Sequence, residues 1–310
     1  MEYSRVICTF TTLCKHPGEH GVSCIFIVPG AIFHGHSALS QFSRISRECS
    51  MTTMISLIQI IMCSLNLCQF QGPDGMAALS GVLYLCCEGA GTVVSLDSSF
   101  SMVIECSGLD SPEGICLMPG GEILVTEDAI GGSILMISSG EARVIASDLA
   151  CPEGVACDQT GAIWFTTGGF EAGELLTSLW RVQNGQRERV CSLPSVFSFS
   201  DLEIASDGMV YICSESSGLF GSVSVFSFDP ETGVLAPFAV GVQACEGICL
   251  TNGGFPMYLA AEQGTVYSAD SSGTCTVVCE VRGTIEDVVL MDGELFVSED
   301  SSGSVIRVLP

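Results

Sequence analysis

Short runs of alternating apolar and polar residues fill the chain from about residue 72 to its end. In "SPEGICLMPGGEILVTED" (111–128) one such run follows an acidic turn, and a Gly-Gly turn leads into a second run. Nearly the same pattern returns forty residues later in "CPEGVACDQTGAIWFTTG" (151–168). Alternation with a period of two, bounded by turn residues, is typical of β-strands, and no apolar stripe with helical spacing is present. The pattern therefore predicts an all-β domain made of repeats.

The repeat occurs six times, at intervals of 39 to 48 residues. Its copies begin at 72–79, 111–118, 151–158, 199–206, 244–251 and 284–291. Each copy holds a β run, a turn, a second β run and a third run, and all but the last add a fourth run. Four strands in some forty residues are typical of one propeller blade. We therefore predict a six-bladed β-propeller of four-stranded blades over residues 55–310.

The sixth copy ends at Pro310 after its third strand. A closed propeller needs a fourth strand there, because an unpaired strand edge would otherwise remain open. The apolar run "SLIQIIMCSLNL" (56–67) lies just before the first copy, and we expect residues 55–71 to supply the missing strand. The run is too short and interrupted for a transmembrane helix. A signal-peptide core, some fifty residues into the chain, is the weaker alternative.

Residues 1–54 lack the repeat and differ in composition from the rest. All four His residues lie before residue 37, whereas 71–310 holds six Arg, no Lys and 32 acidic residues. We expect an N-terminal extension that packs poorly against the propeller. A true start at Met51 or Met54 is an alternative.

The whole chain carries 35 acidic and 10 basic residues, a net charge of −25. This balance excludes nucleic acid as a partner, because such binding needs a basic surface. It favours cations, although an acidic surface kept for solubility is the plain alternative. Many of the 18 Cys residues fall inside apolar runs, where they are typical of small buried side chains. We therefore expect a reduced, cytoplasmic protein, with secretion or an organelle as alternatives.

Acidic residues recur at fixed places in the repeat. The first set begins the first β run of each copy: Asp74, Glu113, Glu153, Asp201, Glu246 and Glu286. The second set ends the second β run, with Thr167 in its place in the third copy: Glu88, Glu127, Glu215, Glu262 and Glu299. The first strand of a blade lines the channel and the second runs back beside it. Both sets are therefore expected at one mouth of the channel.

Carboxylates crowded at one mouth need a compensating partner. Two of them ~6 Å apart repel each other by roughly 3 kcal/mol at an effective dielectric constant of ~20. Some must be protonated, accept N–H groups in their turns, or share a cation. Ca²⁺ takes six to eight oxygen ligands, so we expect a divalent cation, Ca²⁺ first, with Mg²⁺, Mn²⁺ and Zn²⁺ as alternatives. The competing interpretation is that each acid caps a turn in its own blade and no ion is shared.

Several catalytic classes are excluded by what 71–310 lacks. It contains no His, no dinucleotide- or phosphate-binding Gly-rich motif, and no H-E-x-x-H motif. A His-based triad or general base cannot be built from these residues.

The stretch "PDGMAALSGVLYLCCEGAGTVVSLD" (73–97) resembles the senescence-marker-protein/gluconolactonase propellers. The resemblance implies that Asp74 is a ligand of a divalent metal at the channel mouth and takes part in catalysis. The "PEG" copies are also similar to NHL and virginiamycin-B-lyase propellers. Two features depart from these families. The Asn ligands typical of lactonases have no clear counterpart, since 71–310 contains only Asn184 and Asn252, both in turns, and the catalytic His of the lyases has no counterpart at all.

The predicted function is therefore a divalent-metal-dependent hydrolase that acts on a small ester or lactone at the acidic mouth. Asp74 would be a metal ligand and the catalytic residue. The alternative is a non-catalytic propeller that binds a ligand or a protein partner.

Overall fold

The computed structural model describes residues 7–11, 23–27, 64–171, 173–215 and 223–308. The chain divides into two units, 1–58 and 59–310. In the first unit, β1 (Ile7–Thr11) and β2 (Ser23–Ile27) pair as an antiparallel two-stranded sheet. The rest of the predicted extension, and residues 56–63 of the apolar run, lie outside the described residues.

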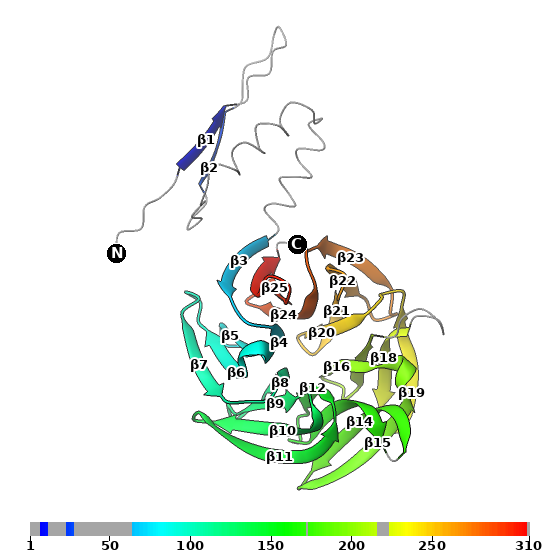
Figure 1. Cartoon of the computed structure of the whole chain (residues 1–310). Coiled ribbons are helices and arrows are strands. Elements are labelled where there is room, and N and C mark those ends of the chain that lie inside the picture. The colour runs from blue at the N-terminus through cyan, green and yellow to red at the C-terminus, as the bar shows by residue number, and fades with distance from the viewer. Residues whose placement is uncertain (1–6, 12–22, 28–63, 172, 216–222, 309–310) are drawn as a thin grey trace. The chain divides into compact units, whose positions relative to one another are not determined.

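The second unit contains six four-stranded antiparallel sheets arranged around a central axis (Figure 1). The prediction of an all-β, six-bladed propeller is confirmed. Blade 1 is β4 (Pro73–Leu79), β5 (Val82–Cys87), β6 (Thr92–Leu96) and β7 (Met102–Ser107). Blade 2 is β8 (Pro112–Leu117), β9 (Ile123–Glu127), β10 (Ile130–Ser138) and β11 (Glu141–Ala150). Blade 3 is β12 (Pro152–Cys157), β13 (Ile163–Glu171), β14 (Glu174–Gln183) and β15 (Gln186–Pro194).

Blade 4 is β16 (Phe199–Ile204), β17 (Val210–Ser214), β18 (Val223–Asp229) and β19 (Val234–Val240). Blade 5 is β20 (Cys245–Thr251), β21 (Gly254–Ala261), β22 (Thr265–Ala269) and β23 (Cys275–Glu280). Blade 6 is β24 (Ile285–Met291), β25 (Glu294–Glu299), β26 (Ser304–Val308) and β3 (Ser64–Gln69). Two short 3₁₀ turns, η1 (Glu88–Ala90) and η2 (Ser195–Phe197), complete the described elements. Among the described residues, no helix is long and apolar enough to cross a membrane.

The last blade is completed by a strand from the other end of the chain. β3 pairs antiparallel with β26, with Gln69 opposite Ser304 and Leu65 opposite Arg307. This strand lies just before the first blade and provides the fourth strand that the final repeat lacks. The pairing closes the ring, so β26 keeps no open edge.

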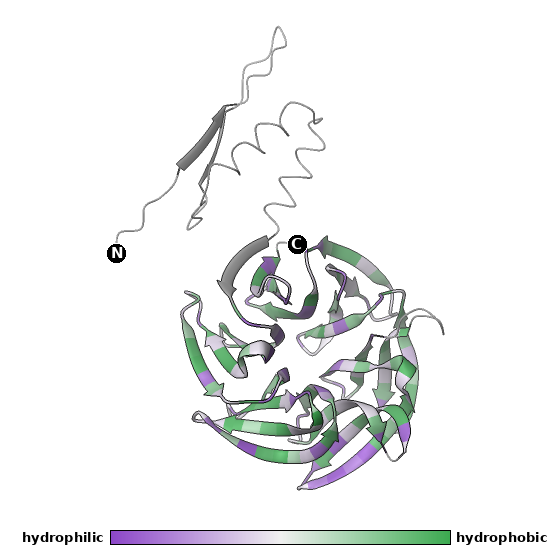
Figure 2. Ribbon diagram, viewed as in Figure 1, coloured by the Kyte–Doolittle hydropathy of each residue, from purple (hydrophilic) through white to green (hydrophobic). Residues whose placement is uncertain are grey.

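The core lies between neighbouring blades. Between blades 6 and 1, Leu83 and Leu85 of β5 pack in one cluster with Phe296 of β25, and all three are almost fully buried. Figure 2 shows apolar residues along most strands, with hydrophilic residues on the outer strand β15. Burying a large apolar side chain contributes about 1.5–3 kcal/mol. The repeated alternation of the sequence thus becomes a ring of apolar interfaces.

The glycine of the "PEG" motif lets the inner strands approach each other closely. A Cβ atom on Gly75 would lie 2.4 Å from the carbonyl oxygen of Glu113, and one on Gly114 would lie 2.1 Å from that of Glu153. Neither distance is compatible with a side chain, so only Gly fits at these positions. The glycines therefore set the spacing of the acidic residues that precede them.

Candidate functional site

One pocket lies on the channel axis, where the six inner strands begin. Its walls include all six acids of the first predicted set, Asp74, Glu113, Glu153, Asp201, Glu246 and Glu286. Ser200 and Asp287, which the sequence analysis did not single out, also line it. The structure therefore brings the predicted residues of all six blades to one mouth.

Strand pairing shows which positions are equivalent in the six blades. Pro73 pairs with Cys87 in blade 1, and Phe199 pairs with Ser214 in blade 4. The residues that follow the first partner form what we call the inner ring: Asp74, Glu113, Glu153, Ser200, Glu246 and Glu286. Asp201 lies one residue further along and is equivalent to Gly75 and Asp287. The sequence analysis matched Asp201 in "FSDLEIAS" to the acidic residues of the other copies, and this placed blade 4 one residue out of register.

A second layer of acids surrounds the inner ring. In every blade, the carbonyl oxygen of the residue just before the inner strand accepts a hydrogen bond of 2.7 to 3.0 Å from the backbone N–H of a residue at or near the end of the second strand. We call these donors the outer ring: Glu88, Asp128, Gly168, Glu215, Glu262 and Asp300. Three predicted rim acids belong to it, and Asp128 and Asp300 were missed. The signal for them was present in the sequence, because each directly follows the acid that had been chosen.

The two remaining rim acids, Glu127 and Glu299, lie one residue earlier, level with Thr167. Glu127 Oε1 accepts a hydrogen bond of 3.0 Å from the N–H of Asp110. Glu299 accepts the N–H groups of Thr284 at 3.2 Å and of Ser302 at 3.0 Å. Burial acts to raise the pKa of Glu299, but hydrogen bonds to its carboxylate outweigh burial and lower the pKa. The turn-capping interpretation therefore describes these two acids.

The carboxyl groups of the inner ring have pKa values shifted in the opposite direction, upwards. Burial, followed by repulsion from Glu286 and Glu88, raises the pKa of Asp74 well above its ordinary value. Burial and the neighbouring carboxylates raise the pKa of Glu246 to about 10 and that of Glu286 to about 7. Within the described ranges, no N–H group donates to the carboxylate of any inner-ring acid. Turn capping therefore does not account for the inner ring.

Inner-ring and outer-ring acids also contact each other directly. Glu113 forms a hydrogen bond with Asp128, and Glu153 forms one with Glu215. Burial raises the pKa of both carboxyl groups in each pair, and it raises that of the inner-ring member more strongly. Glu153 Oε2 and Asp128 Oδ1 are buried, and no N–H or O–H group of the described residues donates to either oxygen. A buried oxygen in this state requires a proton or a cation.

The donor set of the mouth fits a hard divalent cation in its chemistry. It consists of carboxylate oxygens, the ligands that Ca²⁺ prefers. As the side chains stand, however, no three His, Cys, Asp or Glu residues of the described part converge closely enough to hold a metal ion. The pocket has a volume of about 40 Å³, which is room for a few water molecules at about 10–15 Å³ each. An ion with a few water molecules fits this space.

Two acids deeper in the channel hold the inner strands together. Asp287, which is 6% exposed, accepts the N–H of Met76 in blade 1 at 2.6 Å. Asp201 accepts the N–H of Ile248 in blade 5 at 3.2 Å. Each carboxylate also accepts the N–H of the residue that follows it. Both carboxylate oxygens of Asp201, which was predicted as a metal ligand, therefore accept backbone N–H groups.

Known proteins resemble this chain in fold but not closely in sequence. No protein-family model and no curated protein matches the chain. A gluconolactonase from Xanthomonas campestris is 19% identical over 80% of this chain and 89% of its own, with a TM-score of 0.67. Regucalcin from Agrobacterium tumefaciens, a calcium-binding protein, is 14% identical over 79% of this chain and 92% of its own, with a TM-score of 0.62.

A virginiamycin B lyase from Staphylococcus aureus is 16% identical over 80% of this chain and 84% of its own, with a TM-score of 0.57. At these identities the likeness establishes the architecture and not the activity. The predicted resemblance is confirmed at that level. The structural neighbours of the chain are gluconolactonase- and regucalcin-like proteins, and it shares their six-bladed propeller fold.

Proposed function

We propose that the protein is a divalent-metal-dependent hydrolase that acts on a small lactone or ester at the acidic mouth. The observation that carries the proposal is the inner ring: five carboxyl groups with raised pKa values and no N–H donor from the described residues. The shared fold with a gluconolactonase supports the reaction class. Both points agree with the strong excess of acidic residues.

The inner-ring acids Asp74, Glu113, Glu153, Glu246 and Glu286 would hold the cation. A bound divalent cation polarises an ester carbonyl and lowers the pKa of the water beside it. Asp74 would accept a proton from the attacking water, which requires its carboxylate form. Without a positive charge in the ring, the raised pKa of Asp74 disfavours its carboxylate form. A cation bound by the ring would therefore also favour the form of Asp74 that accepts the proton. The outer-ring acids Asp128 and Glu215 would orient their inner-ring partners through the shared protons.

The substrate would lie above the inner ring and beside the outer ring, because the pocket within the ring has room for only a few water molecules. Gly168 leaves the outer ring open on blade 3, because it has no side chain. A lactone can approach the inner ring from that side without meeting a carboxylate.

The test combines metal content with hydrolysis. We expect the purified protein to retain about one divalent cation after dialysis and to open simple lactones in a metal-dependent way. Asp74→Asn should lose both properties. Glu127→Gln is the matched control, because Glu127 lies outside both rings and accepts an N–H of its own turn. Absence of both cation and hydrolysis in the wild type, or full activity of Asp74→Asn, would reject the proposal.

One observation favours a second candidate, a binding propeller without catalysis. Large apolar side chains are exposed where the second and third strands of blades 2 and 3 meet: Ile130 at the start of β10 is 96%, Phe170 near the end of β13 70% and Leu175 near the start of β14 61% exposed. Exposed apolar groups beside an acidic mouth suit a partner with both apolar and basic residues. A protein that binds the cation but hydrolyses no lactone or ester would favour this candidate.

A further inference from the structure

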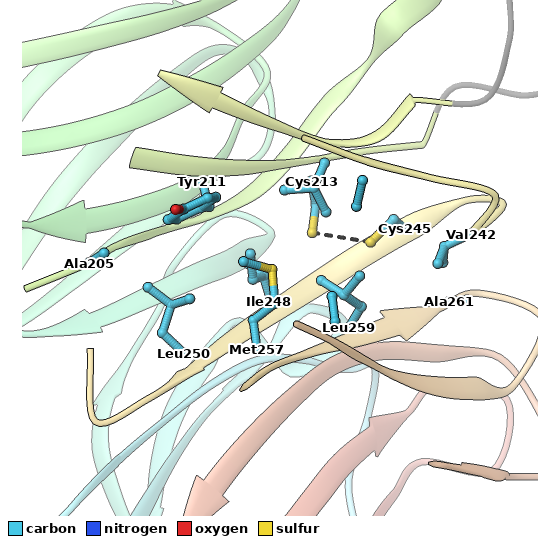
Figure 3. Close-up of a cluster of buried hydrophobic side chains, with 13 residues drawn as sticks. Ala205, Tyr211, Cys213, Val242, Cys245, Ile248, Leu250, Met257, Leu259 and Ala261 are labelled. Carbon is cyan, nitrogen blue, oxygen red and sulfur yellow. Dashed lines mark hydrogen bonds between the residues drawn. The ribbon is translucent and has the colours of Figure 1, made fainter. Parts of the chain in front are cut away.

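Two cysteine side chains meet at the interface between blade 4 and blade 5. Cys213 lies on β17, and Cys245 is the first residue of β20. Their Sγ atoms are 3.2 Å apart, and both residues are 0% exposed (Figure 3). A disulfide bond is about 2.05 Å long, so the two sulfurs need to approach by only about 1.2 Å.

The contact is between the two thiols themselves. Other cysteines of the propeller direct their sulfur to backbone carbonyls, as Cys157 does to Asp158 at 3.4 Å and Cys86 to Gly114 at 3.9 Å. Cys213 and Cys245 instead face each other within an apolar cluster that includes Ile248 and Leu259 (Figure 3). The surrounding strands therefore hold the two sulfurs in place.

We propose that Cys213 and Cys245 form a modification site at which a small-molecule disulfide of the glutathione type creates an inter-blade disulfide bond. One thiol loses its proton, and its sulfur attacks the small disulfide and releases one small thiolate. The second cysteine then attacks the protein-bound sulfur of the mixed disulfide and releases the second small thiol. Two protein thiols are oxidised to one disulfide, and one small disulfide is reduced to two thiols.

The first exchange step takes place before blades 4 and 5 pack together. Burial, and then the neighbouring Cys245, raise the pKa of Cys213 well above its ordinary value. Since the thiolate is the reactive form, the folded pair reacts slowly. During folding both thiols are exposed, and packing of the two blades then brings the sulfurs together. Whether the disulfide bond forms therefore depends on the redox conditions under which the chain folds.

The bond would act next to the channel mouth. Cys245 directly precedes Glu246 of the inner ring, and Ser200 Oγ donates to the carbonyl oxygens of both residues, at 2.8 and 3.0 Å. A link from β17 to this point fixes blade 5 against blade 4 where the ring lacks an acid. It also closes a loop between residues 32 positions apart, which restricts the unfolded chain.

The experiment refolds the full chain in a glutathione redox couple and, in parallel, with a phosphine reductant. Free thiols are then alkylated under denaturing conditions. Trypsin leaves both cysteines on one peptide, because no Lys or Arg lies between Arg189 and Arg282. A protease specific for acidic residues separates them, since Glu215, Asp229 and Glu231 lie between. We expect a linked pair of peptides, about 2 Da lighter than the two free thiol peptides together.

The oxidised protein should also melt at a temperature higher by roughly 5–10 °C, and reductant should reverse the shift. Cys245→Ser should abolish both the linked peptides and the shift, whereas Cys191→Ser, which changes a thiol on β15, should retain them. Should Cys245→Ser fail to fold, Cys213→Ala replaces it. Full alkylation of both cysteines after oxidative refolding, or a bond from either to another cysteine, would overturn the proposal.

Discussion

Replacing Glu246 by Gln removes an ionisable carboxyl group from the inner ring and keeps the shape of the side chain. Glu246 is the best position for this change, because burial and the neighbouring carboxylates raise its pKa from 4.5 to about 10. In metal-free protein at pH 7 the folded state therefore holds a proton on Glu246, whereas the unfolded state does not. Binding that proton on folding costs free energy, and the Gln variant avoids the cost.

The magnitude follows from the pH interval between 4.5 and 7. Each pH unit corresponds to about 1.36 kcal/mol, so the cost at pH 7 is about 3 kcal/mol. A group with a raised folded-state pKa contributes its full stability below its ordinary pKa and loses it as pH rises towards the folded value. The advantage of Glu246→Gln should therefore be small near pH 4.5 and grow to about 3 kcal/mol at pH 7.

The assay is urea unfolding of both proteins in metal-free buffer with a chelator, from pH 4.5 to pH 8. Glu299→Gln is the matched control with the opposite sign, because the pKa of Glu299 is lowered. Its carboxylate stabilises the fold above its ordinary pKa, so this variant should be less stable than the wild type at pH 7. The difference should disappear as pH falls. If Glu246→Gln is destabilised at pH 7, or differs from the wild type equally at all pH values, the reasoning about the inner ring is refuted.

Three further predictions concern the scaffold. Asp287→Ala leaves the buried N–H of Met76 without its 2.6 Å acceptor and should cost about 1–3 kcal/mol of unfolding free energy; a wild-type urea midpoint would contradict this role. Gly114→Ala places a Cβ 2.1 Å from the carbonyl oxygen of Glu153 and should lower the free energy of unfolding by about 1–3 kcal/mol. Gly121→Ala is the control, because nothing lies within 4 Å of its Cβ. It should cost only the strain of its left-handed backbone. Deleting residues 1–50 should leave the melting temperature nearly unchanged, and a loss above about 1–2 kcal/mol would show a real contact with the propeller.

The architecture could be predicted from the sequence because each blade must form the same four-stranded sheet. Every copy needs alternating apolar residues, a tight turn and a close approach at the "PEG" glycine, so the period of the chain shows the number of blades. The need for a closing strand followed from the missing fourth run of the last copy. The place of that strand, Ser64–Gln69, was harder to predict because the whole run 56–67 is apolar.

The register of the acidic residues could not be predicted in the same way. A shift in the pairing separates the first and fourth residues of the inner strands, for example between Pro73 and Met76. Such a bulge makes a match of acid to acid as plausible as the true match, so Asp201 was placed one residue away. Glu127 and Glu299 were chosen because each stands next to a second acid, Asp128 and Asp300. The contacts of Glu113 with Asp128 and of Glu153 with Glu215 depend on the packing of two strands. No local pattern in the sequence encodes them.

The central claim is that the inner ring shares a divalent cation, and chelation at pH 7 tests it most directly. With the cation at about 100 times its dissociation constant, removing it should cost about 2.7 kcal/mol of unfolding free energy. Asp74→Asn, which lacks one ligand, should lose much less. Acidifying the chelated wild type should then restore part of the loss, because protonation relieves the same repulsion. A melting temperature that is indifferent to chelator and added Ca²⁺, together with stability that falls steadily from pH 7 to pH 4, would contradict the shared cation.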